Sequence, residues 1–343
     1  MSENKVTETL KSKKMMAANL HAVGDLRYEE VDIPTCEEDE VLVKVKNCGI
    51  CGSDIGRVLV NGTYHFPTIP GHEFAGIVVE DASGEYIGKR VAVFPLLPCF
   101  HCDMCAEENY AECRQYDYYG SRRDGGYAEY IAVKKWNLIV LPDNVSYEEG
   151  AMCEPVSVAL HAIQKLQIQE GETLLITGAG PIGLIAGMWA KSMGAGKISY
   201  IDIDENKIAF AKSLGFEEYD GESFVDAALE GTGASSAITT TINAVNPFGK
   251  MVLMGNPGRE VELKAKDYQN ILRKELKLRG TWNSVYASGE NNWKESLQAI
   301  SEGKLNVRQL ITHRPSLEET FAAIQMMNDR NEFYCKVVID NEK

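Results

Sequence analysis

Short apolar runs rich in β-branched residues, broken by Gly and Pro, follow one another in the first part of the chain. Four of them have the length and composition of strands: 41–45, 75–79, 90–94 and 127–133. They predict a β-rich first domain over residues 15–155, with long loops between its strands. Residues 1–14 are polar and mixed in charge, and we expect them to form a short flexible extension.

The pattern changes near residue 156, where apolar runs begin to alternate with segments of helical character. The predicted strands are 173–176, 198–201, a weak one at 216–219, 237–243, 251–254 and 276–282. The predicted helices are 182–193, 205–214, 222–229 and 266–274. This alternation indicates an α/β fold, with a doubly wound, six-stranded parallel Rossmann sheet over residues 156–292. Residues 293–343 hold two predicted helices and a closing strand, 336–339, and we expect them to return to the first domain.

Four cysteines lie within fifteen residues, with the spacing Cys99-x2-Cys102-x2-Cys105-x7-Cys113. Four thiolates on one loop can surround a tetrahedral metal ion, and zinc is the metal that this donor set favours. Unrelated buried thiols or disulfides are the alternative, but the chain has nine cysteines, an odd number, and the other five are scattered. Among those five, the predicted packing residues are Cys36, Cys48, Cys153 and Cys335.

Charge and hydropathy narrow the class of protein. The 343 residues include 35 Lys and Arg against 50 Asp and Glu, and the resulting net charge of −15 disfavours a nucleic-acid partner. No apolar run is long enough to span a bilayer, so we expect no membrane insertion. Residues 1–14 lack the apolar core of a signal peptide. We therefore expect a cytoplasmic protein, in a compartment where thiols stay reduced and are free to bind metal.

A glycine-rich motif, Gly178-x-Gly180-Pro181-Ile182-Gly183, joins a predicted strand to a predicted helix. The first glycine permits a tight turn, the second lets a pyrophosphate approach the backbone, and the third lets the helix pack on the strand. Asp202 ends the next predicted strand, nineteen residues after Gly183. A carboxylate there binds the adenosine ribose and repels a 2′-phosphate. The motif therefore predicts NAD rather than NADP as the cofactor.

The first domain offers the residue types of a second metal site in Cys51-Gly52-Ser53-Asp54, Gly71-His72-Glu73 and Glu154-Pro155. Taken singly these residues are ordinary, because a lone His is more often structural than a ligand. With the four-cysteine segment and the glycine motif, in this order, they resemble the zinc-dependent medium-chain alcohol and polyol dehydrogenases. The resemblance extends over nearly the whole chain from residue 15.

That resemblance implies a GroES-like catalytic domain and two zinc ions per chain, one structural and one catalytic. It implies Cys51, His72 and Glu154 as ligands of the catalytic zinc, with Glu73 as an alternating or near ligand and water or substrate completing the coordination. Alcohol dehydrogenases of the family carry a cysteine where this chain has Glu154, and the Glu is similar to the polyol branch. The family's usual assembly is a homodimer or a homotetramer.

The resemblance also implies how a proton leaves the substrate. Ser53 would take up the proton of the alcohol, and Asp54 would orient a ligand imidazole. The alcohol dehydrogenases often continue this path to a His three residues after the Ser. This chain has Gly56 at that position, so the proton must leave through water or another group.

The segments 95–100, 120–126 and 271–276 resemble a branch of the family that oxidises phosphorylated sugar alcohols. Such a dianion is repelled by an acidic protein, so it needs a local cationic group. Arg57 is the first candidate for that group, and Lys274 or Arg273 is the second. Tyr64, His65 and Asn283 are candidates for lining the polyol site. For each of these residues an ordinary surface role is the alternative.

Three other functions remain open from the sequence. A sorbitol or threonine dehydrogenase would share all the metal and cofactor residues. A zinc-dependent regulatory or nucleic-acid-binding protein would need a basic face near the four cysteines, whereas that loop carries Asp103, Glu107, Glu108 and Glu112. A zinc-free reductase relative would lack Cys51 and the four-cysteine segment.

Overall fold

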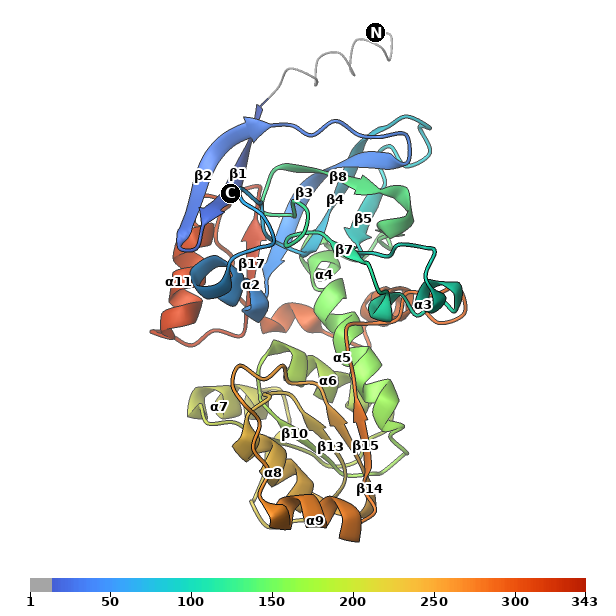
Figure 1. Ribbon diagram of the computed structural model, residues 1–343, viewed down its shortest axis with the longest axis vertical. Coiled ribbons are helices and arrows are strands. Elements are labelled where there is room, and N and C mark those ends of the chain that lie inside the picture. The colour runs from blue at the N-terminus through green and yellow to red at the C-terminus, as the bar shows by residue number, and fades with distance from the viewer. Residues whose placement is uncertain (1–13) are drawn as a thin grey trace. The chain divides into compact units, whose positions relative to one another are not determined.

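The computed structural model describes residues 14–343, which form two compact units. The first unit comprises residues 14–154 and Tyr286–Lys343, and the second comprises Pro155–Val285 (Figure 1). The sequence places these divisions at 155/156 and 292/293. The expected N-terminal extension falls almost entirely on residues 1–13, which lie outside the described residues.

A seven-stranded sheet forms the centre of the first unit. Its strand order is β16-β17-β3-β4-β5-β9, and β8 also pairs with β3. The bounds are β3 Glu40–Ile50, β4 Glu73–Asp81, β5 Arg90–Val93, β8 Tyr130–Lys134, β9 Leu138–Val140, β16 Ile311–His313 and β17 Lys336–Asp340. Because β17 runs antiparallel to β3, the end of the chain lies beside residues 47–50. That pairing brings the end of the chain next to the segment that leads into Cys51.

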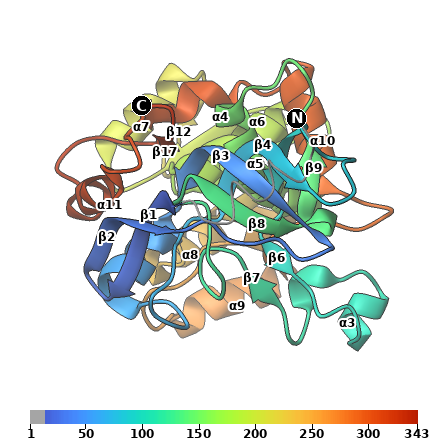
Figure 2. The ribbon, with the colours of Figure 1, turned by 90° about the horizontal axis from the view of Figure 1, so that it is seen from above.

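Smaller elements surround this sheet. Two further strand pairs are β1 Lys14–Ala22 with β2 Asp25–Asp32, and β6 Leu96–Leu97 with β7 Asp117–Tyr118. The helices are α2 Gly52–Gly56, η1 Arg57–Asn61, α3 Asp103–Ala106, η2 Tyr110–Glu112, η3 Lys135–Asn137, α4 Tyr147–Ala151, α10 Asn292–Ser301, η4 Val307–Leu310 and α11 Thr320–Asp329. In both Figures 1 and 2 the α3 segment projects from the side of the unit opposite the β1–β2 pair. Helix α5, Cys153–Leu166, contains the boundary between the units.

The second unit is a six-stranded parallel sheet with the order β12-β11-β10-β13-β14-β15. This order is that of the doubly wound dinucleotide-binding fold, as predicted. The strands are β10 Leu174–Thr177, β11 Ile198–Ile201, β12 Glu217–Glu218, β13 Val225–Glu230, β14 Val245–Leu253 and β15 Lys277–Gly280. The helices are α6 Pro181–Ser192, α7 Glu205–Ser213, α8 Ser235–Ala244 and α9 Ala265–Arg273. The chain reverses its direction across the sheet at β10, where the glycine motif lies.

Two elements of this unit were predicted wrongly, and each has the opposite type. The predicted helix 222–229 is strand β13, and the predicted strand 237–243 is helix α8. β13 is a central strand buried on both faces, so it shows no alternation, and its alanines and glutamate mimic a helix. In α8 the β-branched residues suggest a strand, but Ile238, Thr241 and Ile242 are buried at helical spacing. The Thr241 hydroxyl donates to the carbonyl of Ala237 at 2.7 Å, which satisfies it inside the helix.

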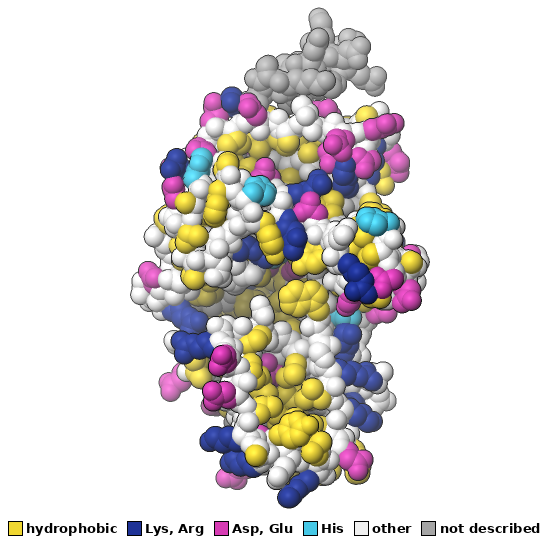
Figure 3. Space-filling view, in the orientation of Figure 1, with side chains coloured by type: hydrophobic (Ala, Val, Ile, Leu, Met, Phe, Trp, Pro, Cys, Tyr) yellow, Lys and Arg dark blue, Asp and Glu magenta, His cyan; other side chains and the backbone are white. Residues whose placement is uncertain are grey.

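The surface agrees with the charge balance of the sequence. On the face shown in Figure 3, acidic and basic side chains are interspersed and do not gather into one basic area. Among residues 14–343 there is no helix that combines the length and the apolar character needed to cross a bilayer. On this face, therefore, the described residues form no surface area suited to binding a nucleic-acid backbone.

Candidate metal and cofactor sites

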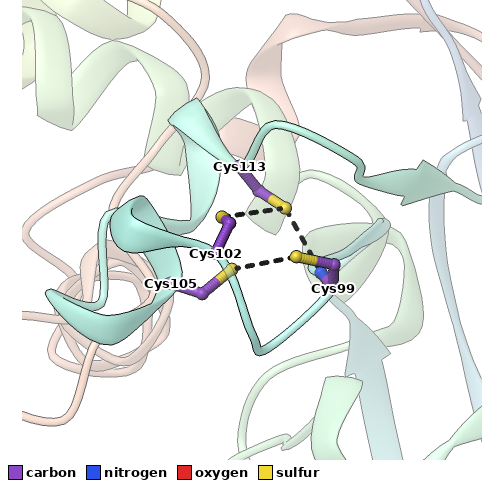
Figure 4. Close-up of side chains that lie close together, drawn as sticks. All are labelled: Cys99, Cys102, Cys105 and Cys113. Atoms are coloured by element: carbon purple, nitrogen blue, oxygen red, sulfur yellow. Dashed lines mark hydrogen bonds between the residues drawn. The ribbon is translucent and has the colours of Figure 1, made fainter.

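The four clustered cysteines converge on a single point (Figure 4). The Sγ atoms of Cys99 and Cys105 are 3.9 Å apart, and those of Cys102 and Cys113 are 4.0 Å apart. All four sulfurs lie within 4.8 Å of one another. A zinc ion bonded to four sulfurs at about 2.3 Å would hold them about 3.8 Å apart. The arrangement therefore fits tetrahedral zinc, and the sulfurs are too distant for disulfide bonds.

Short elements hold these sulfurs in place. Cys102 caps α3 and Cys105 lies within it, while Cys113 follows η2 and accepts a hydrogen bond from the Cys99 amide at 3.2 Å. Hydrogen bonds from the backbone of Arg114 and Cys105 lower the pKa of Cys102 to about 6. Burial, followed by the neighbouring thiols Cys113 and Cys102, raises the pKa of Cys105 to about 12. Since thiolates bind the metal, a dication would be needed to ionise the whole set.

A second set of ligand atoms is assembled by the register of β3 and β4. Gly49 pairs with Glu73, so Cys51, just beyond the end of β3, lies beside His72 and Glu73 at the start of β4. One ligand atom from each of these three residues lies within 4.8 Å of the other two. His72 and Glu73 are buried, and Cys51 is partly exposed. A thiol, an imidazole and a carboxylate together form a donor set that suits zinc.

Asp54 lies behind His72 and fixes its orientation. Its fully buried carboxylate has Oδ1 3.4 Å from Nδ1 of His72 and accepts hydrogen bonds from the Tyr127 hydroxyl at 2.8 Å and the Cys51 amide at 3.0 Å. Burial acts to raise the pKa of Asp54, but the charges of His72 and Arg57 outweigh burial and lower it. With Nδ1 facing this carboxylate, Nε2 of His72 is the nitrogen available to a metal.

The site as a whole favours a cation. Burial acts to lower the pKa of His72, but Asp54 and Cys51 outweigh burial and raise that pKa well above its usual value. Burial raises the pKa of Glu154 to about 7, with Glu73 acting in the same direction and His72 against it. Glu154 opens α5 and is buried, although its carboxylate is not one of the three grouped ligand atoms. A bound divalent metal would stabilise the ionised form of a buried carboxylate such as that of Glu154.

Lys336 is a member of this cluster that the sequence analysis missed. Its side chain, 3% exposed, forms an ion pair with Glu73 and donates to the carbonyl of Ile50 at 3.0 Å. Gly49 leaves the room for this pair, because a Cβ at that position would lie 2.0 Å from Oε2 of Glu73. Glu73 therefore divides its charge between Lys336 and the ligand cluster. The indication in the sequence was a lysine opening the apolar strand β17.

The residues proposed for proton transfer lie next to the same cluster. Ser53 is exposed, and its Oγ accepts a hydrogen bond from Nη1 of Arg57 at 2.8 Å. The same Nη1 donates to Oδ1 of Asp54 at 2.9 Å and lies 3.5 Å from Nδ1 of His72. Arg57 was the first candidate for binding a phosphate. In the structure, Nη1 of its guanidinium is paired with Asp54 and Ser53.

The other substrate candidates have contacts of their own. Tyr64 is 69% exposed and lies against Arg122, and His65 contacts the backbone carbonyls of Pro67 and Arg122. The Lys274 ammonium donates to three carbonyls, those of Ile242, Asn243 and Val245, at the end of α8. Asn283 has a left-handed backbone, with φ of 53°. The last two belong to the second unit and Tyr64 and His65 to the first.

The glycine motif forms the expected turn between β10 and α6. Gly178 has φ of 96°, and a Cβ at Gly183 would lie 2.1 Å from the carbonyl oxygen of Gly178. A Cβ at Gly180 would meet nothing within 4 Å, so the backbone there is open to a ligand. Pro181 begins α6 without an N–H, which leaves the amides of Ile182 and Gly183 at the helix N-terminus for a phosphate. The turn therefore fits a dinucleotide.

Asp202 follows β11 and supports this turn. Its Oδ2 accepts a hydrogen bond from the amide of Ala179 at 2.8 Å, and its Oδ1 accepts one from Asp204 at 3.0 Å. These bonds fix the carboxylate at the edge of the glycine turn. This is where the dinucleotide-binding fold is expected to carry the carboxylate that binds the adenosine ribose.

Known proteins of the zinc-dependent dehydrogenase family are similar to this chain in sequence and in fold. Residues 37–143 match the model of the alcohol dehydrogenase GroES-like domain, and residues 181–302 match the model of zinc-binding dehydrogenases. Galactitol 1-phosphate 5-dehydrogenase of Escherichia coli K12 is 36% identical over 322 residues, 88% of this chain and 93% of that enzyme. The crystal structure of galactitol-1-phosphate dehydrogenase from Escherichia coli matches with a TM-score of 0.88 at 35% identity, covering 95% of this chain and 100% of that one.

Two other relatives widen the range of activities. Sorbitol dehydrogenase of Bacillus subtilis is 32% identical over 336 residues, 91% of this chain and 93% of that enzyme. A Sinorhizobium meliloti protein solved bound to NADP is 28% identical, with a TM-score of 0.88 and coverage of 96% of this chain and 100% of that one. With the two family models and an identity of 36% over most of its length, the chain belongs to the zinc-dependent medium-chain alcohol and polyol dehydrogenases.

Proposed function

We propose that this protein oxidises a sugar-alcohol phosphate, galactitol 1-phosphate, to tagatose 6-phosphate by hydride transfer to NAD⁺. The observation that carries the proposal is the buried cluster of Cys51, His72 and Glu73, with Asp54 oriented against His72. Clusters of this kind are costly to build, because each buried polar group loses its hydration. They are therefore expected where chemistry requires them.

The residues that would hold zinc fall into two groups. Cys51 and His72 would bind the catalytic ion, with Glu73 close by and paired to Lys336. Glu154, buried at the start of α5, would be the third ligand, as the family resemblance implies. Cys99, Cys102, Cys105 and Cys113 would bind a second, structural ion in a closed site. When bound, the catalytic zinc supplies a Lewis acid that makes the hydroxyl of the substrate more acidic.

Ser53 would move the proton of the substrate. Arg57 donates to its Oγ at 2.8 Å and so holds the hydroxyl beside the cluster. The remaining lone pair of Oγ can accept the substrate proton while its own O–H donates to water, since Ser53 is exposed. Gly56 offers no side chain to continue the path, so water carries the proton away. Asp54 keeps His72 in the tautomer that presents Nε2.

NAD is the cofactor that this chain favours over NADP. The amides at the N-terminus of α6 would bind the pyrophosphate, and Asp202 would accept hydrogen bonds from the adenosine ribose. A 2′-phosphate would approach the Asp202 carboxylate, and the two negative charges would repel each other. NAD supplies the hydride acceptor of the reaction.

The choice of galactitol 1-phosphate is tested by paired substrates. We expect kcat/KM for NADH formation with galactitol 1-phosphate to exceed that with galactitol by at least tenfold, about 1.4 kcal/mol. A phosphate-binding site rejects an analogue without the phosphate, because its cationic groups are left unpaired. Sorbitol and threonine serve as the controls.

A preference for sorbitol or threonine over the phosphate ester would assign the chain to those branches of the family. The 32% identity to a sorbitol dehydrogenase makes sorbitol the first alternative. In that outcome the metal and cofactor assignments would stand, and the substrate assignment would be wrong.

We further propose that the protein is a cytoplasmic homodimer or homotetramer. Strand β15 lies at the edge of its sheet, and all four of its residues are exposed. Nearby in the sequence, Tyr268, Leu272 and Trp282 expose more than half of their surface, and Leu278 exposes 39%. An exposed edge strand with apolar neighbours is a place where a second chain can pair.

A further inference from the structure

The phosphate of the proposed substrate needs a cationic partner, and the structure shows Arg57 already paired. Arg57 donates to Asp54, Arg114 is paired with Asp103, and Arg123 is paired with Asp117. Arg122 differs from these three. Within residues 14–343, no carboxylate oxygen lies within 4.0 Å of its guanidinium nitrogens, although the side chain is partly buried.

Two tyrosines fix the guanidinium of Arg122. Its Cζ lies 4.1 Å from the ring centroid of Tyr64 and 4.8 Å from that of Tyr116, and its Nη2 donates to the Tyr64 hydroxyl at 3.1 Å. Stacking on aromatic rings restricts the side chain and displaces water from its faces, while the N–H groups other than the one bonded to Tyr64 can still donate to a ligand. The guanidinium is therefore held ready for an anion.

The backbone around Arg122 is equally constrained. The Arg122 amide donates to the carbonyl of Tyr118 at 3.0 Å, the Tyr64 amide donates to the carbonyl of Ser121 at 3.3 Å, and Nε2 of His65 lies 3.1 Å from the carbonyl oxygen of Arg122. These bonds join the segments 61–68 and 118–123. The backbone of Arg122 is thus held from two loops, and supporting hydrogen bonds of this kind are what a binding residue requires.

Aromatic contacts connect Arg122 to the candidate metal ligand His72. The Tyr118 ring lies 5.7 Å from the His72 ring, and the Tyr116 ring lies 6.4 Å from Tyr118. Arg122 stacks on the far member of that pair. Arg122 therefore stands at the end of a series of ring contacts that begins at His72. An extended polyol with a terminal phosphate likewise carries its charge at one end.

We propose that Arg122, held between Tyr64 and Tyr116, binds the phosphomonoester group of the substrate. The proposal rests on the proposed function, since it assigns the phosphate of that same substrate. A guanidinium matches a phosphate through two parallel N–H···O bonds, and such charge-assisted bonds are about twice as strong as neutral ones. In a protein of net charge −15, a local partner of this kind is required to hold a dianion.

The test uses the full-length protein with Arg122→Gln and the matched control Arg123→Gln. The ratio of kcat/KM for galactitol 1-phosphate to that for galactitol is expected to fall at least tenfold in Arg122→Gln. In Arg123→Gln it should stay within about twofold, because Arg123 is bound to Asp117. Inorganic phosphate should compete with galactitol in the wild type and in Arg123→Gln, and at least tenfold less well in Arg122→Gln.

An unchanged ratio in Arg122→Gln, or equal losses on both substrates, would overturn the proposal. If Arg122→Gln unfolds at a lower temperature than the wild type, Arg122→Lys replaces it. That variant keeps the charge and loses the paired donors, so its ratio should lie between those of the wild type and of Arg122→Gln. A wild type without preference for the phosphate ester would refute the substrate assignment instead. In that case competition by inorganic phosphate, lost in Arg122→Gln, still decides the role of Arg122.

Discussion

Replacing Cys51 by Ser is expected to reduce kcat for NADH formation by at least about 10³-fold, roughly 4 kcal/mol of transition-state stabilisation. Cys51 is partly exposed and lies between the end of β3 and the start of α2. A serine hydroxyl stays protonated at neutral pH and is a poor zinc ligand compared with a thiolate. The change is small in volume and lies outside the buried core, so the fold should persist.

Three measurements separate this result from unfolding. The Cys51→Ser variant should bind about one zinc ion fewer than the wild type, unfold within a few degrees of it, and keep its affinity for NAD⁺. Cys36→Ser is the matched control, because Cys36 belongs to neither group of ligands. Activity close to that of the wild type in Cys51→Ser would show that Cys51 does not bind the catalytic ion.

Replacing Cys102 by Ser is expected to act on stability instead. The Sγ atom of Cys102 lies 4.0 Å from that of Cys113 in a group that forms one closed site. Closed zinc sites contribute folding free energy directly, so the midpoint of thermal unfolding should fall by on the order of 10 °C. Within the segment around α3 the Arg114–Asp103 ion pair and the ring contacts of Phe100 with Tyr110 and Trp136 would remain, so we expect a lower unfolding temperature rather than loss of the whole fold.

The two substitutions should therefore have opposite profiles. Cys102→Ser should lose its structural zinc and its stability while the molecules that remain folded at low temperature keep turnover. Cys36→Ser again serves as control and should retain both zinc ions. A Cys102→Ser variant with the wild-type unfolding temperature and zinc content would contradict the structural role of the four-cysteine site.

The sequence predicts best where the ligands are close together along the chain. Cys99 to Cys113 span fifteen residues, and Gly178 to Gly183 span six, so spacing alone defines each loop. Asp54 could also be predicted from the sequence, since it lies three residues beyond Cys51. In these places local chain geometry determines which side chains meet, and a pattern is sufficient.

Prediction fails where distant segments meet. Lys336 reaches Glu73 only because β17 and β4 both pair with β3, and 263 residues separate the two. Arg122 appears in the sequence as one of two adjacent arginines, and only the rings of Tyr64 and Tyr116 distinguish it from Arg123. The wrong type predicted for β13 has a related cause, since burial on both faces removes the alternation that marks a strand.

A metal held by Cys51, His72 and Glu154 is expected to make this chain an NAD-reducing polyol dehydrogenase. The most direct measurement follows bound zinc and NADH formation with galactitol 1-phosphate while a chelator removes the more accessible ion. We predict that the rate falls in proportion to the first zinc ion lost and returns when zinc is added back. A wild-type chain that reduces NAD⁺ at its full rate with no zinc remaining would show that the reaction does not depend on the metal.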